Sequence, residues 1–187
     1  MKPPEPPATW PITIAGIGRD LRLFEISPGV RIAILNILGD SELVQASSTA
    51  LAGKLRDYNA DVLVSPEAKA IPLAHALSLD MKLPYVVLRK SLKPYMGEAL
   101  ASETLSITTG QPQMLYLDER DRERVLGKRV ILLDDVISTG STLQGLRLIM
   151  RKAGADVVTE AAILTEGDRA KWTNIVALGH LPVWVDD

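Results

Sequence analysis

The chain of 187 residues contains no cysteine, only two histidines and few aromatic residues. Without cysteine, the protein has no disulfide, no thiol nucleophile and no zinc site built on thiolates. His75 and His180 are too few for a metal site made mainly of histidines. Aromatic residues make up only 4% of the chain, so side chains that could stack on a flat ligand are scarce. No apolar run is long enough to cross a membrane and no signal peptide is evident, so we expect a cytoplasmic protein.

The remaining composition is typical of a globular protein. Hydrophobic residues make up 47% of the chain and charged residues 24%, and the length favours a single domain over residues 1–187. The net charge of −2 argues against a broad nucleic-acid surface, although not against a local basic patch. Residues 1–11 carry five prolines, which predicts an extended or disordered tail.

Apolar periodicity predicts alternating strands and helices. Strands are predicted at residues 21–26, 31–35, 61–65, 85–88, 104–108, 114–117, 130–133, 157–164 and 174–177. Helices are predicted at residues 40–58, 71–81 and 142–153. Residues 89–101 are polar and irregular, which predicts a mobile loop, and the mixed charges of residues 118–124 predict a solvated turn. The alternation predicts an α/β fold with a central, mostly parallel twisted sheet flanked by helices.

The most informative stretch runs from Val130 to Leu143. Four apolar residues predict a strand buried on both faces, and Asp134 and Asp135 follow where open α/β sheets bind ligands. A loop of small hydroxyl residues then leads into a helix, whose N-terminus favours an anion. An anion pocket beside two carboxylates suits a ligand with a phosphate at one end and vicinal hydroxyls, or a magnesium ion, nearby. The alternative is an ordinary buried strand with two solvated aspartates and a capped helix.

This stretch resembles the motif with which type I phosphoribosyltransferases bind 5-phosphoribosyl 1-diphosphate (PRPP). In that family a hydrophobic strand runs into Asp-Asp, two apolar residues and a small-Thr-Gly-x-Thr loop. The match covers Asp134, Asp135, Thr139, Gly140 and Thr142. A Walker P-loop is the competing motif, but no Gly-Lys-Ser/Thr follows a glycine-rich loop here.

The resemblance implies a role for each residue of the motif. Asp134 and Asp135 would be catalytic residues that hold the ribose hydroxyls. Their contact with metal would be indirect, because PRPP would carry the Mg²⁺ ion. The 5′-phosphate would be bound by Ser138, Thr139, Gly140, Ser141 and Thr142. Val136 and Ile137 would lie under the base. A small hood made from parts of residues 12–38, residues 166–187 or both would read the edge of the base.

A second segment, from Val64 to Pro72, has the sequence Val-Ser-Pro-Glu-Ala-Lys-Ala-Ile-Pro. It resembles the pyrophosphate-binding loop of the same family, which often contains a cis peptide bond between non-proline residues. By that resemblance Glu67, Ala68 and Lys69 would lie against the pyrophosphate. The sequence departs from the family at Ala70, where glycine is usual. The alternative is a simple connection between a strand and a helix.

The third segment begins with Arg89 and Lys90, which resemble the basic pair at the end of a strand in adenine-type enzymes. Together with Lys93 they would neutralise the pyrophosphate. Residues 95–103 would form a lid, in which Glu98 or Glu103 would approach the base or the transition state. The alternative is that these charges are simply solvated.

Together these resemblances imply a magnesium-dependent purine phosphoribosyltransferase of nucleotide salvage that forms a homodimer. The loops favour adenine as the base, with hypoxanthine or guanine next and xanthine as a further candidate. A different class of function is a regulator that senses PRPP on the same fold and binds DNA or RNA. The acidic balance and the lack of an N-terminal helix-turn-helix count against that regulator. An inactive paralogue is a third hypothesis, and Ala70 is the residue that suggests it.

Overall fold

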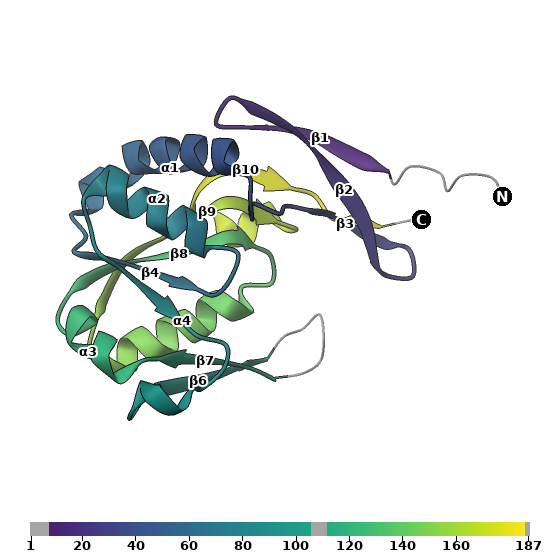
Figure 1. Ribbon diagram of the computed structural model, residues 1–187. Coiled ribbons are helices and arrows are strands. Elements are labelled where there is room, and N and C mark those ends of the chain that lie inside the picture. Colours follow the sequence, from purple (N-terminus) through teal and green to yellow (C-terminus); the bar gives the residue numbers. More distant parts are fainter. Residues whose placement is uncertain (1–7, 106–111, 186–187) are drawn as a thin grey trace.

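The computed structural model describes residues 8–105 and 112–185 of the chain (Figure 1). The α-helices in these residues are α1 (Ser41–Leu55), α2 (Ile71–Met81), α3 (Glu119–Val125) and α4 (Ser141–Lys152). Short 3-10 helices are η1 (Arg56–Tyr58), η2 (Pro94–Met96) and η3 (Arg169–Trp172). None of the helices in the described ranges is long and apolar enough to span a membrane.

A five-stranded sheet forms the centre of the molecule. Its strands are β4 (Val62–Pro66), β5 (Tyr85–Leu88), β8 (Arg129–Ile137), β9 (Asp156–Glu166) and β10 (Val176–Leu181). The order is β10-β9-β8-β4-β5, and every neighbouring pair is parallel. The carboxyl ends of all five strands therefore meet at one edge, which confirms the predicted α/β fold with a parallel sheet.

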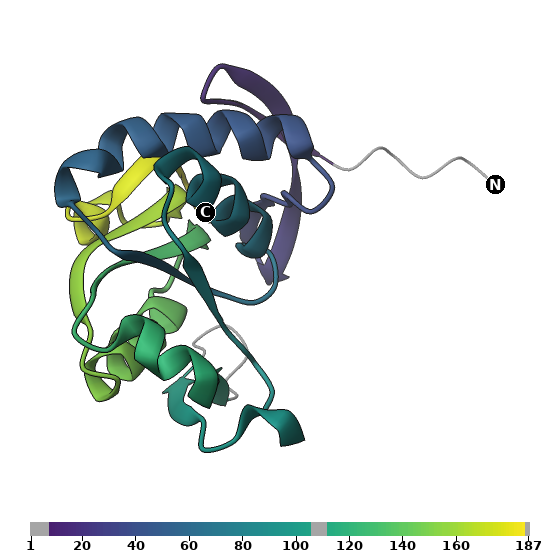
Figure 2. The same ribbon diagram turned by 60° about the vertical axis from the view of Figure 1, so that its left-hand side comes forward.

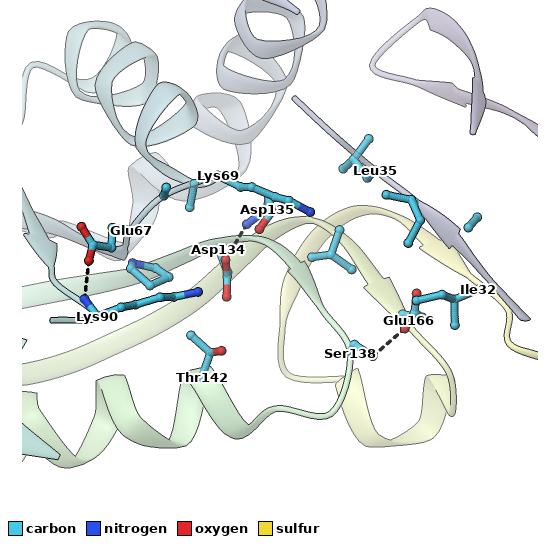
Figure 3. A pocket seen from close by; sticks show the side chains of 16 residues that line it. Ile32, Leu35, Glu67, Lys69, Lys90, Asp134, Asp135, Ser138, Thr142 and Glu166 are labelled. Carbon is cyan, nitrogen blue, oxygen red and sulfur yellow. Dashed lines mark hydrogen bonds between the residues drawn. The ribbon is translucent and has the colours of Figure 1, made fainter. Parts of the chain in front are cut away.

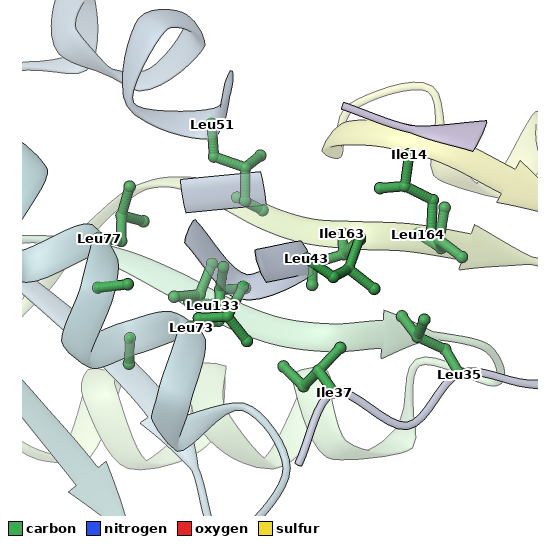
Figure 4. Packing of buried hydrophobic residues seen from close by; sticks show 14 of the residues in the cluster. Ile14, Leu35, Ile37, Leu43, Leu51, Leu73, Leu77, Leu133, Ile163 and Leu164 are labelled. Atoms are coloured by element: carbon green, nitrogen blue, oxygen red, sulfur yellow. The ribbon is translucent and has the colours of Figure 1, made fainter. Parts of the chain in front are cut away.

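Helices cover both faces of this sheet, with α1 and α2 on one face and α4 on the other (Figure 1). Alternate residues of β8 explain this arrangement, because successive side chains on a strand point to opposite faces. Ile131 and Leu133 pack in a core with α1 and α2, while Val130 and Leu132 belong to a second core with α4. Figure 4 shows leucine side chains of α1 and α2 gathered around Leu133. The buried apolar run of the sequence thus holds β8 at the centre of the sheet.

A second sheet stands at one end of the molecule, beside the start of α1 (Figure 1, Figure 2). Its strands are β1 (Thr9–Ile14), β2 (Ile17–Ser27), β3 (Val30–Ile34) and β11 (Trp184–Val185), in the order β1-β2-β3-β11. All of its pairs are antiparallel. Arg19 on β2 pairs with Asp40, the N-cap residue of α1, at 2.8 Å. That ion pair ties the small sheet to the helical layer. Whether this sheet is the predicted base-reading hood stays a prediction.

The remaining strands are β6 (Leu100–Leu105) and β7 (Pro112–Leu117), which pair as an antiparallel hairpin. The hairpin begins earlier than predicted, so the expected loop at residues 89–101 ends in β6. We expect a turn at residues 109–112 between these two strands; residues 109–111 lie outside the described part of the chain, and Pro112 begins β7. The charged segment at 118–124 is not a solvated turn, because it forms most of α3, with Asp118 and Asp121 buried. Asp118 caps this helix by accepting a hydrogen bond from the Arg120 N–H at 3.1 Å.

The tail predicted over residues 1–11 extends too far, because β1 begins at Thr9. Pro11 pairs with Asp20 of β2, and β1 is the edge strand of its sheet. Proline has no N–H to donate, so a strand tolerates it at an edge, where one side of the backbone needs no partner strand. Residues 1–7 lie outside the described part of the chain.

Candidate active site

A cavity of about 370 Å³ opens at the carboxyl edge of the five-stranded sheet (Figure 3). The ends of β4, β8 and β9 form one side, and β3 of the small sheet forms the facing wall. Its lining residues are Ile32, Ala33, Ile34, Leu35, Pro66, Glu67, Ala68, Lys69, Ala70, Lys90, Asp134, Asp135, Val136, Ser138, Thr142 and Glu166. Residues from both predicted loops and from the motif strand are thus brought to one place.

Asp134 and Asp135 lie inside β8, which continues to Ile137 instead of ending at Leu133 as predicted. Both aspartates are buried, and the Asp135 N–H donates to Asp134 Oδ1 at 2.9 Å. Burial raises the pKa of Asp134 well above its usual value, and the negative charge of Asp135 raises it further. Two buried carboxylates side by side favour hydroxyl donors or a cation as a ligand.

The raised pKa of Asp134 leads to a prediction about stability. The folded protein binds this proton more tightly than the unfolded chain, so the free energy of unfolding should fall as pH rises through the raised pKa. Asp134→Asn cannot ionise, so the variant should lose stability less steeply over the same range. Denaturant unfolding of the ligand-free protein between about pH 4 and pH 8 measures both slopes. Equal slopes in the two proteins would contradict the assignment.

The loop between β8 and α4 forms a second, smaller cavity of about 180 Å³. Thr139, Gly140, Ser141 and Thr142 line it together with Gln113 of β7, and their binding of phosphate stays a prediction. Gly140 has a φ of +80°, the left-handed conformation that glycine adopts without strain. Figure 1 shows that the loop leads directly into α4, whose first backbone N–H groups have no partner within the helix. This geometry suits a phosphate group.

Ser138 differs from the other residues of this loop, because its hydroxyl donates to Glu166 Oε1 at 2.5 Å (Figure 3). Glu166 ends β9, is 5% exposed and lines the main cavity. Burial raises the pKa of Glu166, while the Ser138 hydroxyl and His180 act in the opposite direction. The sequence analysis placed Glu166 at the start of a candidate hood segment, residues 166–187, but gave it no role of its own. The signal was present, since this carboxylate follows the apolar run of β9 just as Asp134 follows that of β8.

The second predicted loop joins β4 to α2, and the peptide bond between Glu67 and Ala68 is cis. The Glu67 carboxylate accepts hydrogen bonds from Arg89 Nε at 2.6 Å and from the Lys90 N–H at 2.5 Å. Burial raises the pKa of Glu67, but these two donors outweigh it and hold the pKa below its usual value. Glu67 therefore links this loop to the end of β5, and Arg89 is turned toward it.

Two lysines give the cavity its positive charge. Figure 3 shows the side chains of Lys69 and Lys90 extending into the cavity from two different strand ends. Ala70 lines the same region with a φ of −75° and a ψ of −12°, an ordinary helical conformation. The backbone at this position therefore does not require the glycine that is usual in the family.

The structure does not bring every predicted residue into the cavity. Arg89, Lys93, Glu98 and Glu103 are absent from its lining, and the predicted pyrophosphate role of Arg89 stays a prediction. Glu98 lies between η2 and β6, where its N–H donates to Glu119 at 3.0 Å, and Glu103 pairs with Met114 in the hairpin. Both glutamates are exposed. Their catalytic roles, and the pyrophosphate role of Lys93, stay predictions.

The two apolar residues after the aspartates are separated by the strand's alternation. Val136 lines the main cavity as predicted. Ile137 does not, because it is 2% exposed and packs in the core with α4. Adjacent residues of an extended strand point to opposite faces, so a single ring stacked on one face of β8 meets only Val136.

Comparison with known proteins gave consistent matches. Residues 35–177 match the family described as "Phosphoribosyl transferase domain". The hypoxanthine/guanine phosphoribosyltransferase of Methanococcus vannielii is 35% identical over 139 residues, which cover 74% of this chain and 69% of that protein. The corresponding protein of Methanotorris igneus is 32% identical over 146 residues, covering 78% and 73%.

Solved structures of adenine phosphoribosyltransferases share the fold. The enzyme from Thermoanaerobacter pseudethanolicus superimposes with a TM-score of 0.66 at 22% identity, covering 92% of this chain and 95% of the other. The enzyme from Trypanosoma brucei, in complex with AMP, pyrophosphate and ribose-5-phosphate, gives a TM-score of 0.65 at 20% identity, covering 92% and 76%. At these identities the likeness concerns the arrangement of the chain.

Proposed function

Because the chain belongs to the phosphoribosyltransferase family, we propose that it transfers the 5-phosphoribosyl group of PRPP to a purine base, releasing pyrophosphate. The observation that carries this proposal is the pair of adjoining cavities at one sheet edge, which are lined by the aspartate pair, the phosphate loop and two lysines. Each of the three groups matches the chemistry of one part of PRPP. In PRPP the ribose carries the 5′-phosphate at one end and the diphosphate at the other.

The aspartate pair would hold the sugar. Ionised Asp134 or Asp135 accepts hydrogen bonds from the vicinal hydroxyls of ribose. Carbon 1 of the sugar gains positive charge as the bond to pyrophosphate lengthens, as in glycoside cleavage. Negative charge close to the ring stabilises that state more than the ground state. The backbone N–H groups of the loop at residues 139–142 would bind the 5′-phosphate and fix the ring in place.

Lys69 and Lys90 would hold the pyrophosphate as it leaves. Their amino groups extend into the cavity and would offset the negative charge that develops on the departing group (Figure 3). Nitrogen 9 of the purine would attack carbon 1 from the opposite face, so the configuration at that carbon inverts. Lys93, Glu98 and Glu103 would reach the reactants only if the segment that carries them moved toward the cavity.

Magnesium fits this arrangement as an ion that arrives with PRPP. Among the described residues, no cluster of three or more His, Cys, Asp or Glu side chains could hold a metal alone. Mg²⁺ usually needs only one or two carboxylates when substrate phosphates supply further ligands. Asp134 and Asp135 provide such a pair, and their contact with the ion would be indirect, as the sequence analysis expects. When bound, the ion would neutralise charge on the diphosphate.

Two classes of purine have separate support as the base. The motif at residues 66–69 and the Arg89-Lys90 pair resemble adenine enzymes. The relatives from Methanococcus vannielii and Methanotorris igneus, at 35% and 32% identity, are instead named hypoxanthine/guanine phosphoribosyltransferases. The purine assignment is common to both, and the choice between them depends on how the cavity reads the base edge.

The decisive experiment measures pyrophosphate release from PRPP and Mg²⁺. Adenine, hypoxanthine, guanine, xanthine, uracil and orotate are tested separately with the purified protein. We expect turnover with at least one purine. Turnover with a pyrimidine alone would overturn the purine assignment. No turnover with any base, despite measurable PRPP binding, would favour the PRPP-sensing regulator. A salt-dependent shift in the electrophoretic mobility of DNA or RNA would then test that regulator.

We also propose that the protein acts as a cytoplasmic homodimer, as the family resemblance implies. Sedimentation velocity of the purified protein at micromolar concentration tests the assembly. A species of twice the chain mass of 20.3 kDa is expected, and a monomer under assay conditions would contradict it.

A further inference from the structure

The main cavity is chemically different at its two ends. Figure 3 shows Lys90 on one side of the aspartate pair and Glu166 on the other. The end that carries Lys90 suits the diphosphate. The opposite end combines a buried carboxylate with the apolar side chains of Ile32 and Val136. A flat ring with a polar edge fits an apolar wall beside a single well-placed polar group.

Glu166 is held in a fixed position at that end. Ser138 donates its hydroxyl hydrogen to Oε1 at 2.5 Å, and the side chain is almost completely buried. Oε2 has no hydrogen-bond partner among the residues that the structure describes. Glu166 lines the cavity, so this oxygen is available to accept a hydrogen bond from a ligand that brings an N–H group. As a carboxylate, Glu166 accepts hydrogen bonds and donates none.

We propose that Glu166 reads the purine edge through its N–H donors, and that the protein therefore prefers a 6-oxopurine, with guanine the best substrate. This inference rests on the proposed function of the same cavity. Guanine presents the ring N1–H and the 2-amino group side by side, and a carboxylate can accept both. Adenine presents a lone pair at N1, which would face the Glu166 oxygens. This order of preference reverses the one that the loop motifs favour.

Glu166→Gln tests the inference because the amide keeps the shape and changes the hydrogen-bonding pattern. The amide has one acceptor and one donor group, which matches the 6-amino group and N1 of adenine. We expect the ratio of kcat/KM for guanine to kcat/KM for adenine to fall about 10- to 100-fold, the usual effect of losing a hydrogen bond to a charged group. Glu166 accepts a hydrogen bond from Ser138 of the phosphate loop, and the amide oxygen of glutamine can still accept it. The KM for PRPP should therefore change less than the base ratio.

Glu160→Gln is the matched control. Glu160 is also a buried glutamate of β9, but it pairs with Arg147 and does not line the cavity. This variant can lower stability, yet it should leave the ratio between guanine and adenine unchanged. A ratio that moves equally in both variants would show that Glu166 acts only through the fold.

A binding measurement on the unaltered protein keeps the inference testable if Glu166→Gln does not fold. Calorimetry with GMP and AMP should show tighter binding of GMP by about tenfold or more. Tighter binding of AMP would overturn the inference. Purine turnover with an unchanged base ratio in folded Glu166→Gln would also overturn it, while leaving the proposed function intact. Absence of turnover with every base would remove the proposed function and this inference with it.

Discussion

Asp135→Asn is expected to lower kcat/KM for PRPP by about 10²- to 10³-fold, the range seen when one group that stabilises transition-state charge is removed. The amide has nearly the same shape as the carboxylate but carries no charge. It would therefore hold the ribose hydroxyls less strongly and offset less of the positive charge at carbon 1. Both kcat and kcat/KM should fall, since the charge develops mainly in the transition state.

The control for this variant is Asp156→Asn. Asp156 begins β9, is exposed and lies at the opposite edge of the sheet from the cavity. Removing its charge should leave the rate within about twofold of the unaltered protein, since surface charges away from a site have little effect. Thermal melting of both variants checks that they fold. Near-normal turnover by folded Asp135→Asn would refute the assignment of the motif.

Gly140→Ala is the second variant with a large expected effect. The φ of +80° costs an alanine about 1–2 kcal/mol. In addition, a Cβ at this position would lie 2.8 Å from the ring of Trp172, which is anchored by a hydrogen bond from its Nε1 to the Glu166 carbonyl. The loop must shift to relieve this contact. We expect the KM for PRPP to rise about tenfold or more, because misplaced N–H groups lose the phosphate.

Gly127→Ala separates the two causes. Gly127 also has a positive φ, +67°, but a Cβ there would meet nothing within 4 Å. This variant should show the cost of the backbone conformation alone, without any change in the KM for PRPP. Gly140→Ala combined with Trp172→Ala should recover part of the PRPP affinity. If Gly127→Ala and Gly140→Ala behave alike in both stability and KM, the contact with Trp172 has no role.

Local sequence patterns predicted the parts of the fold that depend on near neighbours. The helix at residues 71–81 and the strand at residues 85–88 agree with α2 and β5 to the residue. Their boundaries follow from short signals: proline in the first turn of α2, and a short apolar run for β5. The phosphate loop was equally predictable, because all of its residues are consecutive.

Residues brought together by topology were not predictable in the same way. Gln113 reaches the phosphate loop from a hairpin, and Ile32 faces Glu166 from a separate sheet. No sequence spacing connects these positions, since their proximity depends on how sheets pack. Pairing between strands also explains β1, where an edge position accommodates Pro11. The segment at 118–124 was wrongly predicted as a solvated turn. Its charged residues instead cap and form a short helix.

The wall of the cavity that faces Glu166 can change in evolution independently of the opposite wall. β3 forms its backbone hydrogen bonds with β2 and β11, and none with the five-stranded sheet that carries the aspartates and the phosphate loop. Substitutions at residues 32–35 can therefore reshape one side of the cavity without disturbing the strand pairing on the other. A lineage with this architecture can exchange one ring-shaped substrate for another while its machinery for the sugar phosphate is inherited unchanged.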